Sequence, residues 1–210
     1  MYNLSYFKAK DDKEVLAFMK ANPFITLCGI DTNNKPVATH IPILFEEREG
    51  KLFLQAHIMR KQNHTNAFEQ NSNVLALFVS NYSYVSASLY EQKNIASTLN
   101  YMAVHVSGII KFLGDEELYN LLVKLTDTFE GNSNSVAAIK NMDAAYVQNN
   151  MKAIVAFEIE VTDIQHVFKL SQNHSKKDYE NIVDSLQSKD AGGKFIATEM
   201  EKIKDDLFVN

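Results

Sequence analysis

The chain has 210 residues, of which 46% are hydrophobic and 22% are charged, as is ordinary for a soluble globular protein. Its formal net charge of −5 disfavours a generic nucleic-acid surface, because neutralising phosphates needs a basic face. The single cysteine, Cys28, cannot form an internal disulfide, so a reducing cytoplasm is the predicted location. No stretch approaches the roughly 18 apolar residues of a membrane span, and the N-terminus lacks the apolar run of a signal peptide.

The first predicted element is a helix that begins after Asp11. We expect Asp11 to be its N-cap, with Glu14 three residues further on, which is the spacing of a capping box. Apolar residues then recur at helical spacing, and Asn22-Pro23 ends the helix.

A run of strands follows, and polar turns join them. The predicted strands cover 24–30, 36–45, 51–58, 73–79, 83–87 and 99–113, with a short helix over 63–70. Short turns between consecutive strands imply antiparallel pairing, because a parallel crossover needs a dozen or more residues.

The second half of the chain is mainly helical, with one long strand. We expect a helix from Asp115, a second helix over roughly 135–148, a strand over 152–168, a helix that Ser175 caps, and a last helix in the tail to Asn210. An antiparallel β core with peripheral helices is either an α+β fold or a closed barrel with helices.

Polar residues stand inside segments that otherwise alternate like buried strands. Between Ser97 and Gly108, Asn100 and His105 are an odd number of residues apart and therefore point to opposite faces of a strand. Similar mixtures occur at 38–44, 55–61 and 84–90. Hydrogen-bonding groups on several strands of one sheet can line a ligand site, so a small-molecule pocket is the leading hypothesis.

Arg60 and Lys61 end a predicted strand, just before the helix that begins near Asn63. Two cations beside the free N–H groups of a helix N-terminus suit an anion such as phosphate. The alternative is two solvated charges at a strand end. The residues alone favour that alternative, because the chain has no Gly-rich phosphate loop.

The histidines show no spacing that is typical of a zinc site, so no metal site is predicted. His40, His57 and His105 fall on predicted strands and are interpreted as hydrogen-bonded wall residues. In the polar connection over 168–175, Lys169 and Gln172 either reach a ligand or serve the turn before the capped helix. Both interpretations of that connection stay open.

Nine short segments of the chain form an ordered set: Met1-Tyr2, Asn22–Phe24, Ala38–Pro42, His57–Arg60, Tyr84–Tyr90, Thr98–Tyr101, Val104–Val106, Ile154–Ile159 and Phe168–Asn173. In this order they resemble the PaiB-like family, whose members are described as FMN-binding negative transcriptional regulators. The chain resembles that family to about residue 188, which is nearly its whole length.

The resemblance implies an α+β fold of the FMN-binding type, an antiparallel split β-barrel with peripheral helices that is related to pyridoxamine-phosphate-oxidase-like flavoproteins. It implies a single domain over residues 1–188, with 189–210 as a C-terminal tail or helix that packs on the domain or on a dimer partner. It also implies a cytoplasmic homodimer with its FMN sites at the subunit interface.

The resemblance further implies which residues contact FMN. The implied phosphate contacts are Arg60 and Lys61, with His57 nearby. The implied contacts along the isoalloxazine ring are Thr39, His40 and Ile41. The opposite wall or the other subunit supplies Ser86, Ser88, Thr98 and Asn100, and the predicted set is completed by His105, Lys169 and Gln172.

Three functions are compatible with these patterns. The first is an FMN-binding protein that acts as a negative transcriptional regulator and binds DNA only if regulation is direct; the chain has no helix-turn-helix with a basic recognition helix. The second is an FMN-dependent oxidoreductase, for which His40 and His105 are the acid–base candidates. The third and more remote one is a haem-binding split barrel with a histidine as axial ligand.

The chain departs from the family at several positions, including Gln62-Asn63, where relatives have Asn-Pro. Relatives commonly have proline and tryptophan where this chain has Ala87 and Leu89, and again where it has Ser97 and Leu99. The loss of two large aromatic side chains removes contact area, and the loss of two prolines removes rigidity from the loops that carry them.

Overall fold

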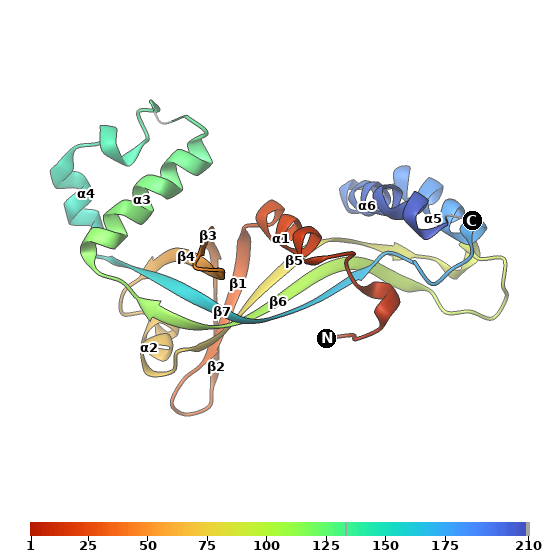
Figure 1. The fold of residues 1–210 in the computed structure, drawn as a ribbon, viewed down its shortest axis with the longest axis horizontal. Helices are drawn as coiled ribbons and strands as arrows, with labels where there is room; N and C mark the ends of the chain where they lie inside the picture. The colour runs from red at the N-terminus through yellow and green to blue at the C-terminus, as the bar shows by residue number, and fades with distance from the viewer. Residues whose placement is uncertain (133, 209–210) are drawn as a thin grey trace. The chain divides into compact units, whose positions relative to one another are not determined.

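The computed structural model describes residues 1–132 and 134–208 of the chain (Figure 1). Its strands are β1 (Phe24–Ile30), β2 (Pro36–Pro42), β3 (Leu44–Arg48), β4 (Lys51–Met59), β5 (Asn73–Val85), β6 (Thr98–Phe112) and β7 (Ile154–Lys169). Its α-helices are α1 (Asp12–Ala21), α2 (Asn63–Gln70), α3 (Asp115–Glu130), α4 (Ala144–Met151), α5 (Lys176–Gln187) and α6 (Ala191–Leu207). Three short 3₁₀ helices are η1 (Ser5–Phe7), η2 (Ala87–Leu89) and η3 (Ile139–Asn141).

The strands form one sheet in the order β2-β1-β5-β6-β7-β4-β3. The pairs β1–β2, β1–β5, β3–β4 and β4–β7 are all antiparallel. This confirms the predicted α+β fold, a curled antiparallel split β-barrel with helices around it.

Helix α1 begins where the sequence predicts. The Asp11 carboxylate accepts a hydrogen bond from the Glu14 backbone N–H at 2.9 Å, so Asp11 is the N-cap. The Glu14 carboxylate accepts from the Lys10 N–H at 2.6 Å, one residue before the cap. The capping box is therefore present, with its return bond shifted by one residue.

Two predicted elements have wrong boundaries. The helix expected over roughly 135–148 is instead η3 and α4, and α4 begins after Asp143, whose carboxylate accepts from the Tyr146 N–H at 2.8 Å. Residue 133 lies outside the described residues. The strand expected over 36–45 is split at Ile43, whose N–H donates to the Pro23 carbonyl at 2.9 Å.

The strands expected over 73–79 and 83–87 form the continuous strand β5. The polar residues in the middle, Ser80 and Ser83, resemble a turn in the sequence, but both are buried. The Ser80 hydroxyl accepts from the Met102 N–H of β6 at 2.9 Å, so the hydroxyl has a partner inside the sheet.

The chain divides into two compact units. Unit 1 comprises Met1–Asn22, Phe78–Val104 and Gln165–Asn210, and unit 2 comprises Pro23–Leu77 and His105–Ile164. Strands β5, β6 and β7 contribute residues to both units. Each unit has a hydrophobic core and a set of polar contacts of its own.

In unit 1, helices α5 and α6 pack against each other. The buried Tyr179 hydroxyl of α5 donates to the Met200 carbonyl of α6 at 2.8 Å. Ile182, Leu186 and Ile196 are fully buried beside them. The helix predicted in the tail is therefore confirmed over Ala191–Leu207.

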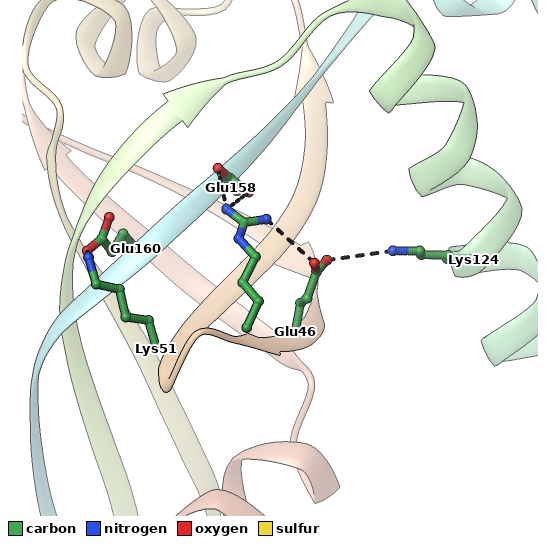
Figure 2. Close-up of polar contacts among 6 residues, drawn as sticks. Glu46, Lys51, Lys124, Glu158 and Glu160 are labelled. Carbon is green, nitrogen blue, oxygen red and sulfur yellow. Dashed lines mark hydrogen bonds and ion pairs between the residues drawn. The ribbon is translucent and has the colours of Figure 1, made fainter.

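In unit 2, helices α3 and α4 share an apolar cluster with β7. Its buried members are Leu118, Leu121, Leu125, Val147, Met151 and Ala156. Ion pairs join the same elements to β3 and β4 (Figure 2): Arg48 contacts Glu158 and Glu46, Lys124 of α3 lies 3.6 Å from Glu46, and Lys51 lies 2.5 Å from Glu160.

The N-terminal segment of unit 1 is fixed to β7 through His166. The Ala9 N–H donates to His166 Nε2 at 3.0 Å, and Lys8 Nζ donates to the His166 carbonyl, also at 3.0 Å. Burial lowers the pKa of His166, the Lys8 charge lowers it further, and Asp12 and Glu14 oppose the shift. The Ala9 hydrogen bond needs an unprotonated Nε2, so this contact is specific to the neutral imidazole.

We predict that His166 makes the fold less stable in mild acid. The folded pKa lies below the unfolded value of about 6.5, so the unfolded chain binds the proton more readily. The free energy of unfolding therefore falls as the pH drops below about 6.5, and this contribution levels off below the folded pKa. Urea unfolding of wild type and His166→Gln, at pH about 7.5 and about 5, measures the effect.

The amide oxygen that the His166→Gln variant introduces can still accept from the Ala9 N–H, so both proteins should have similar stability at the higher pH. At the lower pH the variant should retain more of its stability than wild type does. An identical loss in both proteins would show that His166 does not contribute to the pH dependence.

Candidate functional site

Two cations follow directly after β4 in unit 2. The Arg60 guanidinium lies 3.4 Å from the exposed carboxylate of Asp115, and its backbone N–H donates to the Ala153 carbonyl at 2.8 Å. Lys61 has a left-handed backbone, with φ of 61°, and its ammonium contacts no partner among residues 1–132 and 134–208. Within the described residues, the weak ion pair between Arg60 and Asp115 is therefore the only polar side-chain contact that either cation makes.

Helix α2 begins immediately after these cations. Its N-cap, Gln62, makes no side-chain capping bond, so the N–H groups of the first turn receive no side-chain acceptor from the cap. The buried Thr65 hydroxyl donates to the Met59 carbonyl at 2.7 Å and ties this turn to the end of β4. The positive end of the helix dipole and the two cations thus adjoin one another in the chain.

His57 lies further back on β4. Its Nδ1 is buried and has no hydrogen-bond partner within the described part of the chain. Burial lowers the pKa of His57, which favours the neutral ring. An unpartnered buried nitrogen costs about 1–3 kcal/mol, so a ligand that satisfies it recovers that cost. This nitrogen, the two cations and the uncapped helix fit a ligand that carries a phosphate group.

Strand β2 carries the residues predicted along the isoalloxazine ring. His40 is opposite Thr26 of β1, with Thr26 Oγ1 and His40 Nδ1 3.0 Å apart, and the His40 ring stacks on Phe24 at 6.2 Å. Ile41 is buried and Thr39 is half-buried. Since β2 is at one end of the sheet order, its outer backbone groups lack a strand partner in the described sheet. Backbone contacts to a ligand are therefore available here.

A cavity of about 660 Å³ adjoins α2 in unit 2. It is lined by the turn between β1 and β2 and by polar side chains of α2, including Asn63 and Asn66. None of the predicted site residues lines this cavity. Ala38 and Gln62 do line it, and they are the sequence neighbours of the predicted residues Thr39 and Lys61. His105, also in unit 2, is half-buried, and burial lowers its pKa.

In unit 1, Ser86 and Ser88 contact each other. Their hydroxyl oxygens are 2.8 Å apart, and Ser86 caps η2 by accepting from the Ser88 N–H at 3.2 Å. The Ala87 N–H donates to the Ser97 hydroxyl at 2.9 Å. Two of the positions at which the chain departs from its relatives are therefore bonded to each other. Proline at either position would remove this bond.

Lys169 and Thr98, also in unit 1, form a second contact between predicted residues. Lys169 Nζ donates to Thr98 Oγ1. The ammonium lies 6.0 Å from the centre of the Tyr2 ring and 5.8 Å from that of Phe7, and no carboxylate pairs with it in the described residues. Burial lowers the pKa of Lys169. A half-buried cation without a counter-ion favours an anionic partner.

Two predicted amide side chains are already bonded within unit 1. Asn100 is fully buried; its Nδ2 donates to the Ser171 hydroxyl at 2.9 Å, and its Oδ1 accepts from the same hydroxyl at 3.2 Å. Gln172 Nε2 donates to the Phe168 carbonyl at 2.6 Å, and its Oε1 accepts from the Leu170 N–H at 2.8 Å. The structure therefore gives both amides protein partners.

Tyr90 in unit 1 is a candidate site residue that was not among those predicted from the sequence. Its hydroxyl is buried and has no partner among the described residues, and its ring stacks on His174 with centroids 4.4 Å apart. Burial, with a smaller effect of the Asp178 charge, raises the pKa of Tyr90. The sequence feature that could have indicated Tyr90 is its position at the end of the polar segment 84–90. The rings of Tyr2 and Phe7 approach the Lys169 ammonium, and no sequence pattern indicated this contact because both residues lie far from Lys169 in the chain.

Comparison with known proteins identifies the family. The family model described as "Putative FMN-binding domain" matches residues 1–163. The chain is 30% identical over 206 residues to Protease synthase and sporulation protein PAI 2 of Bacillus subtilis, a match that covers 98% of this chain and 97% of that protein.

Two solved structures resemble the fold. The FAD and heme binding protein from Mycobacterium smegmatis matches with a TM-score of 0.57 and 15% identity, over 77% of this chain and 72% of that chain. The flavocytochrome Anf3 from Azotobacter vinelandii matches with a TM-score of 0.56 and 15% identity, over 80% of this chain and 72% of that chain. At this identity both structures support the fold alone.

No helix within the described ranges has the length and apolar character that a membrane span needs. The match to the family model covers most of the chain, and the identity to the Bacillus protein extends over almost all of it. The chain therefore belongs to the PaiB-like family of FMN-binding split-barrel proteins, for which FMN is the cofactor.

Proposed function

We propose that unit 2 holds the FMN phosphate through Arg60, Lys61 and the first turn of α2, with His57 as a further donor. The observation that carries this proposal is the buried, unpartnered Nδ1 of His57 on the strand that ends at these two cations. Neutral histidine with its proton on Nδ1 can donate to a phosphate oxygen. Arg60 and Lys61 supply charge-assisted hydrogen bonds to the same group.

The other predicted residues have supporting rather than central roles in this proposal. Lys169 and Thr98 act together as a second polar pair for the flavin, because Lys169 lacks a carboxylate within the described residues. Ser86 and Ser88 present neighbouring hydroxyls on a capped turn. When bound, FMN supplies electron-transfer chemistry, and the residues of this chain bind and orient it.

We also infer that the protein acts as a homodimer with its flavin sites at the subunit interface. Strands β5 and β6 of unit 1 expose large apolar side chains: Val79 at 58%, Tyr82 at 66%, Tyr84 at 55% and Leu99 at 45%. Such side chains on two neighbouring strands are typical of a protein–protein interface. A second copy of the chain is the partner that the family resemblance implies.

We further propose a cytoplasmic location, on the basis of the lone Cys28. A regulatory role, as the family resemblance implies, would act through a partner rather than through direct DNA contact. The support for this is the net charge of −5, since a DNA-binding surface is basic.

Removal of both cations should strongly weaken FMN binding. Hydrogen bonds to charged groups contribute about 1.5–3 kcal/mol each, so Arg60→Ala combined with Lys61→Ala should reduce FMN affinity by at least about 100-fold. Titration of the apoprotein with FMN, followed by quenching of flavin fluorescence, measures the change.

The matched control is Lys111→Ala, which removes an exposed β6 cation that has no partner in the described residues. It should leave the affinity unchanged. Equal FMN affinity for the double variant and wild type would refute the phosphate site. A loss that Lys111→Ala shares would indicate a general electrostatic effect instead.

A charge on the exposed strand face should dissociate the homodimer. Val79→Glu combined with Tyr82→Glu would bury two carboxylates in the proposed interface, which is costly without partners. Sedimentation velocity should show a dimer for wild type and a monomer for the variant. Phe129→Glu changes an exposed aromatic residue of α3 and should stay dimeric. A wild-type monomer at micromolar concentration would contradict the interface.

A further inference from the structure

A second cavity, in unit 1, has a chemistry different from that of the proposed phosphate site. It has a volume of about 660 Å³, which is in the range of small-molecule sites. Its lining residues come from the segment around η1, from the start of α1, from the end of β7 and the residues after it, and from the last turns of α6.

The floor and walls of this cavity are largely apolar. Phe168 and Leu170 are each 2% exposed and lie at its base, and Ile203 of α6 lines a wall. Tyr6 and Leu207 line the cavity while remaining partly exposed to water. A ligand with an apolar body would cover Tyr6, Ile203 and Leu207, whose side chains keep exposed surface, and would remove that surface from water.

The carboxylates that line the cavity already have partners. Asp11 caps α1, and Glu14 accepts from the Lys10 N–H. Both lie at the N-terminal end of α1, where the helix dipole stabilises negative charge. Asp206 pairs with Lys10 at 2.7 Å. Because each of these carboxylates already has a hydrogen-bond or ion-pair partner, the cavity is not expected to favour a cationic ligand.

Lys8 is different, because it lines the cavity and its ammonium has no carboxylate partner in the described part of the chain. It donates a hydrogen bond of 3.0 Å to the His166 carbonyl, which is neutral. The other lining lysines are paired, Lys10 with Asp206 and Lys202 with Glu199. Lys8 is thus the cation that is available to a ligand.

We propose that this cavity binds a small amphipathic anion, with its apolar body on Tyr6, Ile203 and Leu207 and its carboxylate or sulfonate group on Lys8. The site goes beyond FMN binding and does not depend on it. Gln172 also lines the cavity, but both ends of its amide are bonded to backbone, so it acts as wall rather than as a ligand contact.

A matched pair of fluorescent probes tests the proposal on the full chain. Anilinonaphthalene sulfonate carries one anionic group on an apolar ring system, and N-phenyl-naphthylamine has the same rings without the charge. Since a charged hydrogen bond separates them, wild type should bind the sulfonate about tenfold more tightly than the neutral probe. Equal affinities, or preference for the neutral probe, would overturn the assignment of the anion to Lys8.

Three variants locate the binding. Lys8→Gln should remove the preference for the sulfonate and leave the affinity for the neutral probe unchanged. Lys13→Gln, at an exposed lysine of α1 that does not line the cavity, should behave as wild type. Ile203→Gln should weaken binding of both probes. The same loss in Lys13→Gln and Lys8→Gln, or unaltered binding in Ile203→Gln, would overturn the site.

Competition with FMN tests whether the cavity in unit 1 is distinct from the flavin site. Saturating FMN should leave sulfonate binding to wild type unchanged, and the variant that lacks Arg60 and Lys61 should bind the sulfonate as wild type does. Displacement of the sulfonate by FMN would overturn an independent site. A protein that fails to bind FMN but keeps the Lys8-dependent preference would refute only the phosphate site.

Discussion

The packing of the sheet in unit 2 depends on one buried carboxylate, that of Glu158. Glu158 on β7 is only 8% exposed, and both of its oxygens accept hydrogen bonds from Arg48 Nη2 at 2.8 Å. A buried carboxylate needs such a partner, because removal from water without compensation strongly destabilises the charged form. The Arg48 guanidinium also lies 3.7 Å above the Phe53 ring, and Glu46 connects it to Lys124 of α3 (Figure 2).

The ion pair between Arg48 of β3 and Glu158 of β7 links the two strands that flank β4, since β4 is paired with β3 on one side and with β7 on the other. Strand β4 ends at Met59, and Arg60 and Lys61 follow it directly. The proposed phosphate site therefore lies at the end of a strand that has a paired neighbour on each side. The Nδ1 of His57, which has no partner in the described residues, belongs to β4, so the proposed donor and the two cations lie on this strand and on the residues that directly follow it.

Local signals in the sequence predicted the parts of the fold that local interactions determine. The Asp11 cap and the alternation of the strands are of this kind. The helix expected over 135–148 begins later in the structure, because its capping residue, Asp143, lies further along the chain, and the apolar Val136 is 91% exposed. For the site, the sequence indicated Lys169 and Thr98, but the rings of Tyr2 and Phe7 beside Lys169 come from the distant N-terminal segment. The burial of Asn100 is a property of tertiary packing and has no local signature.

The hydrogen bond between the Ala87 N–H and the Ser97 hydroxyl has an evolutionary consequence. The family resemblance implies proline at both positions, and in such a pair one residue lacks the donor and the other lacks the acceptor. If only one of the two prolines were replaced, the new donor or acceptor would lack its hydrogen-bond partner. Replacement of both prolines gives up the rigidity of two rings and gains the hydrogen bond between residues 87 and 97. The two sites are therefore expected to covary among homologues, and a lineage that has lost one proline should be under selection to lose the other.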